Sequence, residues 1–195
     1  MHPKDMMLKA LQECPIIASL QKPELVPVVI ASNARIVMVS SGDIFNIVEI
    51  CNALRKKNKI VLVHIDLVAG MSRDKTAVRY LKEKAGIHGI VSSNSQLIPF
   101  VQKEGLVTAQ RLFAIDTPSI TTGLTCLRNS KADFIEVMPG LAVPEVYDAI
   151  RTSFQQPIIA AGLIKRQKDV ELALKAGAIG VDTSNQKLWN YSGKK

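Results

Sequence analysis

The sequence has 195 residues, of which 47% are hydrophobic and only 5% aromatic, and it carries a formal charge of +8. These values exclude a wholly disordered chain, and a core of Ile, Val, Leu and Ala favours α/β packing over a β-sandwich. The three cysteines are widely spaced and odd in number, which argues against a disulfide framework or a zinc site. The positive charge permits binding to a polyanion, but it also fits an ordinary solvated surface.

No apolar run approaches the roughly 18 residues that a membrane span needs. Residues 1–5 also lack the apolar segment of a signal peptide. We therefore expect a cytoplasmic protein with no membrane partner, and the free cysteines agree with a reducing compartment.

Short apolar strands alternate with helical patterns in the first half of the chain. Asp43 is expected to cap the second helix, and Pro27 is expected to shorten the first one. The expected strands span residues 15–20, 35–40, 59–67 and 88–92, and the expected helices span residues 23–32, 43–58, 74–84 and 94–103.

The second half continues the same alternation. Asp116 is expected to cap a helix that carries Ile120, Leu124 and Leu127 on its apolar face. The expected strands span residues 107–113, 133–137, 157–161 and 178–181, and further helices span residues 143–153 and 167–176, with a short last helix through Trp189.

Eight strand–helix alternations with short connections require a parallel sheet with right-handed crossovers. Eight units predict a small (β/α)8 TIM-type barrel, since about 250 residues is typical of this fold. An open doubly wound sheet is the alternative, but it normally carries a glycine-rich phosphate loop in its first βα turn, and residues 20–23 contain no glycine. We predict a single barrel domain over residues 1–195, with residues 1–14 as a helical or frayed extension.

Charged side chains lie at the expected carboxyl ends of several strands, where barrels of this type build their sites. They are His64 and Asp66 on the third strand, Arg111 on the fifth and Glu136 on the sixth. Burying charges is costly unless they pair or bind something, so we predict a binding pocket here. The alternatives are a paired charge layer that only fills the barrel mouth and a satisfied core histidine at position 64.

The last two strands end in small and hydroxyl residues, Gly162 after the seventh and Thr183 and Ser184 after the eighth. Glycine allows close backbone approach, and helix amino-terminal N–H groups favour phosphate, so these loops predict a phosphate site. Lys165 on the rim is a further candidate. The alternative is that Thr183 or Ser184 only caps the last helix.

No catalytic set is convincing. The sequence offers no Ser-His-Asp ordering at a nucleophile elbow, no metal-ligand cluster and no strand lysine for a Schiff base. Asp66 and Glu136 have the chemistry of an acid–base pair, so a phospho-sugar isomerase or an aldolase-type barrel enzyme remains the alternative to a binding protein.

Several blocks resemble the glycerol-3-phosphate-responsive antiterminator family, in the same order along the chain. The first contains the segment Val63-His64-Ile65-Asp66-Leu67-Val68-Ala69-Gly70. Together the blocks are specific, although each alone is weak. They comprise residues 63–70, 110–117, 132–140, 157–164 and 176–189.

The resemblance implies a barrel without required turnover that binds glycerol 3-phosphate and acts on leader mRNA of glycerol-utilisation genes. Transcription antitermination would be its role, with no cofactor beyond that ligand. The resemblance places His64, Asp66, Arg111 and Glu136 in the central pocket and Gly162, Thr183 and Ser184 beside the phosphate. This sequence departs from the family pattern at Ala161, where a second glycine is common, and at Asp182, where a neutral residue is usual. Asp182 would repel a phosphate if its side chain pointed inward.

The sequence contains no RNA-recognition motif, so basic surface is the only indication of an RNA site. The first basic cluster is expected at the amino-terminal face of the barrel, and no single RNA-contacting residue follows from the sequence. A homodimer also stays open. The basic clusters lie at residues 55–59, 73–84 and 165–168.

Overall fold

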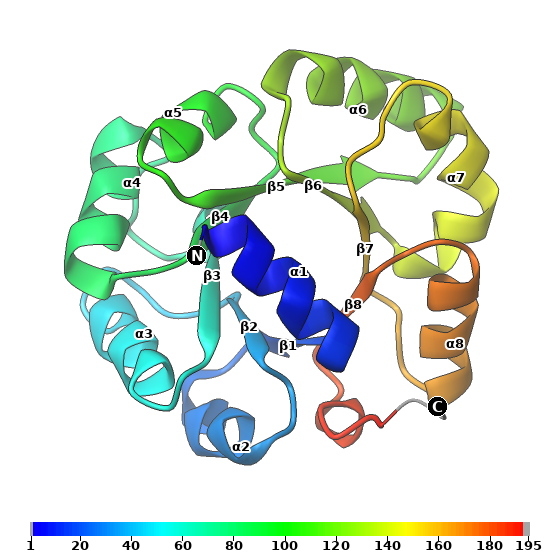
Figure 1. Cartoon of the computed structure of the whole chain (residues 1–195). Helices are drawn as coiled ribbons and strands as arrows, with labels where there is room; N and C mark the ends of the chain where they lie inside the picture. Colours follow the sequence, from blue (N-terminus) through cyan, green and yellow to red (C-terminus); the bar gives the residue numbers. More distant parts are fainter. Residues whose placement is uncertain (1, 193–195) are drawn as a thin grey trace.

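Eight short parallel strands alternate with helices and close into a barrel, in which the last strand pairs with the first. The computed structural model describes residues 2–192 (Figure 1). The predicted TIM-type barrel is confirmed. The strands are β1 (Ile16–Leu20), β2 (Ile36–Val39), β3 (Ile60–His64), β4 (Gly89–Ser92), β5 (Val107–Phe113), β6 (Phe134–Met138), β7 (Ile158–Ala161) and β8 (Gly180–Thr183).

Helices cover the outside of the barrel, except for the first, which lies across one of its open ends (Figure 1). The α-helices are α1 (Pro3–Glu13), α2 (Val26–Ala31), α3 (Ile47–Arg55), α4 (Lys75–Tyr80), α5 (Ile98–Lys103), α6 (Thr117–Ser130), α7 (Val143–Arg151) and α8 (Gln167–Lys175). The 3₁₀ turns are η1 (Pro23–Leu25), η2 (Ile65–Leu67), η4 (Gly140–Ala142) and η5 (Gln186–Leu188), and a π-helical turn, η3 (Leu81–Ala85), continues α4.

Local hydrogen bonds explain where some elements differ from the predicted ranges. The Asp43 carboxylate accepts hydrogen bonds from the N–H groups of Phe45 and Asn46, at 2.9 and 3.1 Å, and closes a turn before α3 begins. Asp43 is therefore not the cap of that helix. The third strand ends at His64, because the chain turns into η2. Asp116 does cap α6, as predicted.

Alternation along the strands separates two apolar layers. Residues such as Val37, Val61 and Ile135 pack outward against the helices. The side chains at the intervening positions fill the barrel interior, because successive strand residues point to opposite faces. The interior residues are Ile17, Ile36, Met38, Ile60, Leu62, Val91, Val107, Ala109, Phe134 and Ile159.

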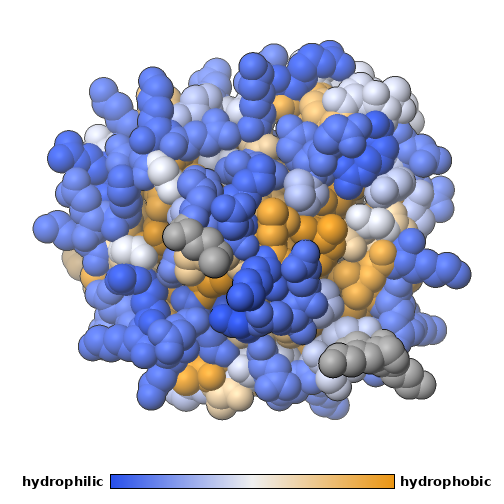
Figure 2. All heavy atoms as spheres, viewed as in Figure 1, coloured by the Kyte–Doolittle hydropathy of each residue, from blue (hydrophilic) through white to orange (hydrophobic). Residues whose placement is uncertain are grey.

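Helix α1 closes the amino-terminal end of the barrel. Its buried residues Met7, Ala10 and Leu11 join the interior apolar cluster. Gly180 leaves room for this helix, since a Cβ there would lie 2.8 Å from a methyl group of Leu11. On the face that α1 shares with the surrounding loops, hydrophilic side chains surround exposed hydrophobic areas near the centre (Figure 2). No helix within residues 2–192 is long and apolar enough to cross a membrane.

Candidate functional site

A buried salt bridge lies at the carboxyl end of the barrel. Arg111 of β5 and Glu136 of β6 are register partners on neighbouring strands, so their side chains point to the same side of the sheet. Arg111 Nε donates to Glu136 Oε2 at 2.6 Å, and the two side chains are only 9% and 0% exposed. The charges at these two positions are therefore paired, as the charge-layer interpretation requires. Glu136 keeps one buried oxygen, Oε1, without a hydrogen-bond partner among the described residues.

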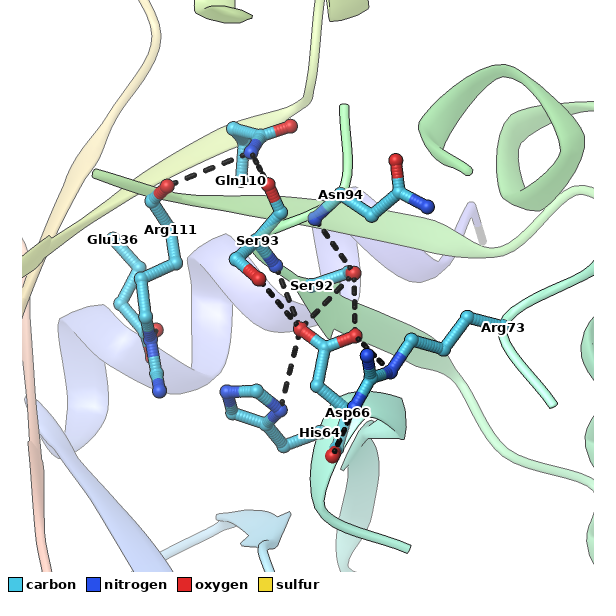
Figure 3. Close-up of polar contacts among 9 residues, drawn as sticks. All are labelled: His64, Asp66, Arg73, Ser92, Ser93, Asn94, Gln110, Arg111 and Glu136. Carbon is cyan, nitrogen blue, oxygen red and sulfur yellow. Dashed lines mark hydrogen bonds and ion pairs between the residues drawn. The ribbon is translucent and has the colours of Figure 1, made fainter. Parts of the chain in front are cut away.

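Asp66 belongs to a second polar cluster (Figure 3). Its carboxylate accepts hydrogen bonds from Ser92 Oγ at 3.0 Å, Ser93 N at 2.8 Å and Ser93 Oγ at 3.0 Å. Arg73 Nε lies 3.4 Å from Asp66 Oδ1, and Arg73 Nη2 donates to the Asp66 carbonyl oxygen. Asp66 thus joins the loops after β3 and β4 instead of pairing with Arg111.

His64 lies between these two clusters and is 2% exposed. Its Nδ1 is 3.9 Å from Asp66 Oδ2, and neither ring nitrogen has a hydrogen-bond partner among the described residues. Burial and the nearby Arg111 charge lower the pKa of His64 to about 4, although Asp66 opposes this shift. The imidazole is therefore neutral near pH 7, and the contact with Asp66 is not an ion pair.

A cavity of about 110 Å³ opens at the barrel mouth, between the ends of β1, β5, β7 and β8. It brings together four of the predicted site residues, Arg111, Gly162, Thr183 and Ser184. His64, Asp66, Glu136 and Lys165 are not among its lining residues. Those residues are Ser19, Gln21, Ser40, Leu67, Arg111, Met138, Gly162, Leu163, Ile164, Asp182, Thr183 and Ser184.

Asp182 points into this cavity and is 5% exposed, because it shares the interior face of the barrel with Ile17, its register partner on β1. Burial raises the pKa of Asp182 well above its usual value, and the neighbouring Glu136 raises it further, while Arg111 lowers it. Its Oδ1 has no hydrogen-bond partner among the described residues. The direction of this shift favours the neutral acid, and a neutral Asp182 does not repel a phosphate.

Thr183 faces the other way, as strand alternation requires. Its hydroxyl donates to the Ile164 carbonyl oxygen at 2.8 Å and accepts a hydrogen bond from Asn185 N at 3.1 Å. Asn185 also caps the final turn, so neither Thr183 nor Ser184 does so. The Thr183 hydroxyl therefore holds the loops after β7 and β8 together.

The loop after β7 has a strained backbone. Gly162 and Leu163 have φ angles of 77° and 61°, in the left-handed region that a leucine rarely adopts. Such strain persists where the surrounding structure imposes it, often at ligand-binding loops. Within residues 2–192, the N–H groups of Gly162, Leu163 and Ser184 make no hydrogen bond to another protein group.

The amino terminus of α8 contributes less to an anion site than the sequence indicates. Asp169 Oδ2 accepts hydrogen bonds from the N–H groups of Lys165 and Arg166, at 3.1 and 2.8 Å. These two groups would otherwise point toward a phosphate. The exposed Lys165 side chain does not line the cavity.

The cavity also contains residues that the sequence-based interpretation did not select. Ser19 and Ser40 stand at the ends of β1 and β2, with their hydroxyl oxygens 3.5 Å apart. A serine in an otherwise apolar strand was the available signal. Trp189 Nε1 donates to the Thr183 carbonyl oxygen at 2.8 Å, which anchors the end of β8.

No His, Cys, Asp and Glu side chains within residues 2–192 cluster in a group that could hold a metal ion.

The raised pKa of Asp182 leads to a testable pH dependence. A carboxyl group whose folded pKa is raised contributes stability that is present below its unfolded pKa and lost as the pH rises through the folded value. Asp182→Asn should therefore become increasingly stable relative to the wild type as the pH rises above about 4, the unfolded value of an aspartate. Urea unfolding at a series of pH values measures this difference. Both proteins contain His64, so its titration does not contribute to the difference between them.

Asp169→Asn provides a control of opposite sign. Hydrogen bonds from the Arg166 side chain and from two backbone N–H groups hold the pKa of Asp169 at about 2, although burial opposes this. This carboxylate contributes stability above its unfolded pKa, so the variant should lose stability relative to the wild type at neutral pH. Parallel pH curves for Asp182→Asn and the wild type would contradict the inward, buried position of Asp182.

Comparisons with known proteins identify the family. The family described as glycerol-3-phosphate responsive antiterminator matches residues 16–189. An Escherichia coli K12 protein, the uncharacterized protein YgcP, is 28% identical over 188 residues, covering 96% of this chain and 98% of that protein.

Two crystal structures show the same architecture. The glycerol uptake operon antiterminator regulatory protein of Listeria monocytogenes has a TM-score of 0.87 at 26% identity, over 92% of this chain and 96% of that one. A glycerol uptake operon antiterminator-related protein of Thermotoga maritima has a TM-score of 0.80 at 27% identity, over 90% and 98%. With the match to the family over most of its length, this chain belongs to the glycerol-3-phosphate responsive antiterminator family.

Proposed function

We propose that this protein is a metabolite sensor that binds glycerol 3-phosphate in the mouth cavity and antiterminates transcription of glycerol-utilisation genes through their leader mRNA. The observation that carries the proposal is its membership of this family over residues 16–189. The geometry of the mouth cavity supplies a physical reason for the ligand.

The size and polarity of the cavity suit a short phosphorylated polyol. A volume of about 110 Å³ is far below the several hundred Å³ of a typical drug-sized pocket. Glu136 Oε1 and Asp182 Oδ1 are buried acceptors without partners, and a buried acceptor costs free energy unless a donor reaches it. The hydroxyl groups of glycerol 3-phosphate are such donors, so Asp182, which lines the cavity, would contact the polyol end. Glu136 does not line the cavity and would act by holding Arg111 in place.

The phosphate would occupy the side of the cavity near β7 and β8. There the free N–H groups of Gly162, Leu163 and Ser184 offer donors on a backbone that approaches closely. Arg111 lines the same cavity and uses only its Nε for Glu136, so its terminal nitrogens supply further donors and a positive charge. In this arrangement Thr183 holds the loop, and Lys165 acts at most through long-range attraction from the rim.

The state of the carboxylates supports a sensor over a barrel enzyme. Asp66 accepts hydrogen bonds from Ser92 and Ser93 and contacts Arg73, and Glu136 is paired with Arg111, so both carboxylates have partners within the protein. None of the eight strands carries a lysine that could form a Schiff base. The cavity therefore has the groups that binding needs.

A titration of labelled glycerol-operon leader RNA with and without glycerol 3-phosphate tests the proposal. A coupling free energy of about 1–3 kcal/mol would raise RNA affinity roughly 5- to 150-fold when the ligand is saturating. Affinity should fall steeply as salt increases, because binding to phosphates releases counterions. Fluorescence anisotropy measures both effects.

Three results would contradict the proposal in different ways. Absence of RNA binding at low salt with saturating ligand would exclude the regulatory role. Ligand binding without RNA binding would indicate a metabolite-binding barrel with another partner. Turnover of a triose or pentose phosphate that Asp66→Asn abolishes would indicate an enzyme.

A further inference from the structure

A large basic groove lies at the opposite end of the barrel from the mouth cavity. It has a volume of about 660 Å³ and is bordered by α1, the carboxyl end of α3 and the starts of β2 and β3. Among its lining residues are five Lys or Arg side chains and one histidine, and no Asp or Glu. We call it the α1–α3 groove. It is lined by Met6, Lys9, Ala10, Arg35, Asn52, Arg55, Lys56, Asn58, Lys59, Ile60 and His88.

Three of these cations are not neutralised. Arg35 pairs with Glu13, and the Lys59 ammonium donates to the carbonyl oxygens of Ser32 and Ala34, at 2.7 and 2.8 Å. Among the described residues, none of the other three cations forms a salt bridge. Those cations are Lys9 on α1, Arg55 at the end of α3, and Lys56 directly after it.

Part of the groove is held in place before any ligand arrives. Arg55 Nη1 donates to Asn52 Oδ1 at 3.2 Å, and the guanidinium packs so closely against Gly86 that a Cβ there would collide with it. His88 Nδ1 accepts a hydrogen bond from Val61 N at 3.0 Å. A neutral His88 therefore carries its proton on Nε2, which is a donor that remains free of this contact.

The two other basic clusters contain eight cations, of which four form salt bridges among the described residues and four, Lys75, Lys84, Lys165 and Lys168, do not. On α4 and η3, Arg79 pairs with Glu83 at 2.7 Å and Lys82 with Glu104 at 3.0 Å. Arg73 contacts Asp66, and at the start of α8 Arg166 pairs with Asp169. The α1–α3 groove is thus where uncompensated positive charge, a concave surface and fixed donors occur together.

The groove has the chemistry of a phosphodiester backbone site. Spaced Lys and Arg side chains bind phosphates, whereas the asparagines Asn52 and Asn58 can hydrogen-bond base edges or sugars. The lining residues include no Phe, Tyr or Trp on which bases could stack, so affinity here would rest mainly on charge. A flexible single strand can place successive phosphates along such a concave surface more easily than a stiff duplex.

We propose that the α1–α3 groove is the site that holds the RNA, as a single-stranded segment whose phosphates contact Lys9, Arg55 and Lys56. The inference rests on the RNA-binding half of the proposed function and adds its location. Because the groove and the mouth cavity lie at opposite ends of the barrel, glycerol 3-phosphate does not compete with RNA. Any effect of the ligand on RNA binding has to be transmitted through the interior apolar cluster, to which α1 contributes Met7, Ala10 and Leu11.

The charge-reversal variant Lys9→Glu/Lys56→Glu tests this location. Both side chains are exposed and come from the two helical segments that border the groove. We expect RNA affinity to fall at least about tenfold, and the slope of log affinity against log salt to become shallower by roughly 1.4, at about 0.7 for each lost phosphate contact. Glycerol 3-phosphate should raise the melting temperature of the variant as it does that of the wild type, which shows that the barrel is folded.

Lys75→Glu/Lys84→Glu is the matched control, with the same change of charge on exposed positions of α4 and η3. It should retain RNA affinity within about twofold, because only general attraction changes. Arg55→Ala is a second variant that removes a fixed donor without reversing a charge, and it too should weaken RNA binding. The probes are the labelled leader RNA, a labelled oligouridylate, and unlabelled ATP as competitor.

The possible outcomes separate this inference from the proposed function. If the wild type binds RNA and Lys9→Glu/Lys56→Glu binds it equally well, or if the control loses as much affinity, the groove is not the site and the proposed function stands. If ATP binds in a manner sensitive to Lys9→Glu/Lys56→Glu but RNA does not, the groove serves a free nucleotide. If the wild type binds no RNA even at low salt with saturating ligand, both ideas are wrong.

Discussion

Arg111→Met should lower the free energy of unfolding by about 3–5 kcal/mol, because it leaves the Glu136 carboxylate buried without its partner. Arg111 Nε lies 2.6 Å from Glu136 Oε2, and Glu136 is fully buried on β6. Removing one member of such a pair leaves an unpaired charge in a low-dielectric interior, where no partner offsets the free-energy cost of desolvation. Urea unfolding followed by the fluorescence of Trp189, the single tryptophan of the chain, measures the loss.

The double variant Arg111→Met/Glu136→Leu separates the stranded charge from a general packing defect. Replacing both members of a buried pair with apolar groups of similar size is often neutral or stabilising, so most of the lost stability should return. The double variant should nevertheless fail to bind glycerol 3-phosphate, since Arg111 lines the cavity and supplies donors to the proposed phosphate. A loss below about 1 kcal/mol for Arg111→Met would show that water reaches Glu136.

Trp189→Ala should also destabilise the protein by about 3–5 kcal/mol, the usual cost of truncating a buried tryptophan. Its side chain is fully buried against the outer apolar layer, and its Nε1 donates to the Thr183 carbonyl oxygen at the end of β8. Because Thr183 in turn joins the loops after β7 and β8, the variant should also bind glycerol 3-phosphate more weakly. Circular dichroism during urea unfolding measures stability, and calorimetric titration measures binding.

Trp189→Phe is the conservative control for this effect. It keeps most of the apolar volume but leaves the Thr183 carbonyl oxygen without its donor, which should cost about 1–3 kcal/mol. The alanine variant should therefore be clearly less stable than the phenylalanine variant. Equal losses would mean that the hydrogen bond, and not packing, carries the contribution of Trp189.

The two ends of the barrel have different chemistry. The carboxyl end carries a small cavity, and a buried ion pair and unpartnered carboxyl oxygens lie at this end. The amino-terminal end carries the wide, basic α1–α3 groove, which α1 borders. The interior between them is one packed apolar cluster that contains both strand residues and α1 residues. Since closely packed interiors transmit displacement, this cluster connects α1 at one end of the barrel with the strands that carry the cavity at the other.

The sequence by itself determined the barrel and the positions of most of its polar groups. Eight alternations of apolar strands with helical patterns leave few other topologies, because parallel strands need a helix to return the chain. The alternation of side chains along each strand then placed Arg111 and Glu136 on the inner face at the carboxyl end, on two neighbouring parallel strands. The order of the strands in the barrel placed Gly162, Thr183 and Ser184 at the neighbouring ends of β7 and β8.

Only the tertiary structure decided which partner each of these groups has. Whether Arg111 meets Glu136 or Asp66 depends on strand register and on the chain turning into η2 after His64, and neither is encoded in local periodicity. The raised pKa of Asp182 depends on burial by several strands together. The uncompensated charge near Lys9 and Lys56 likewise depends on α1 lying across the amino-terminal end of the barrel. Electrostatic and desolvation energies depend on distances in space and not on separation along the chain.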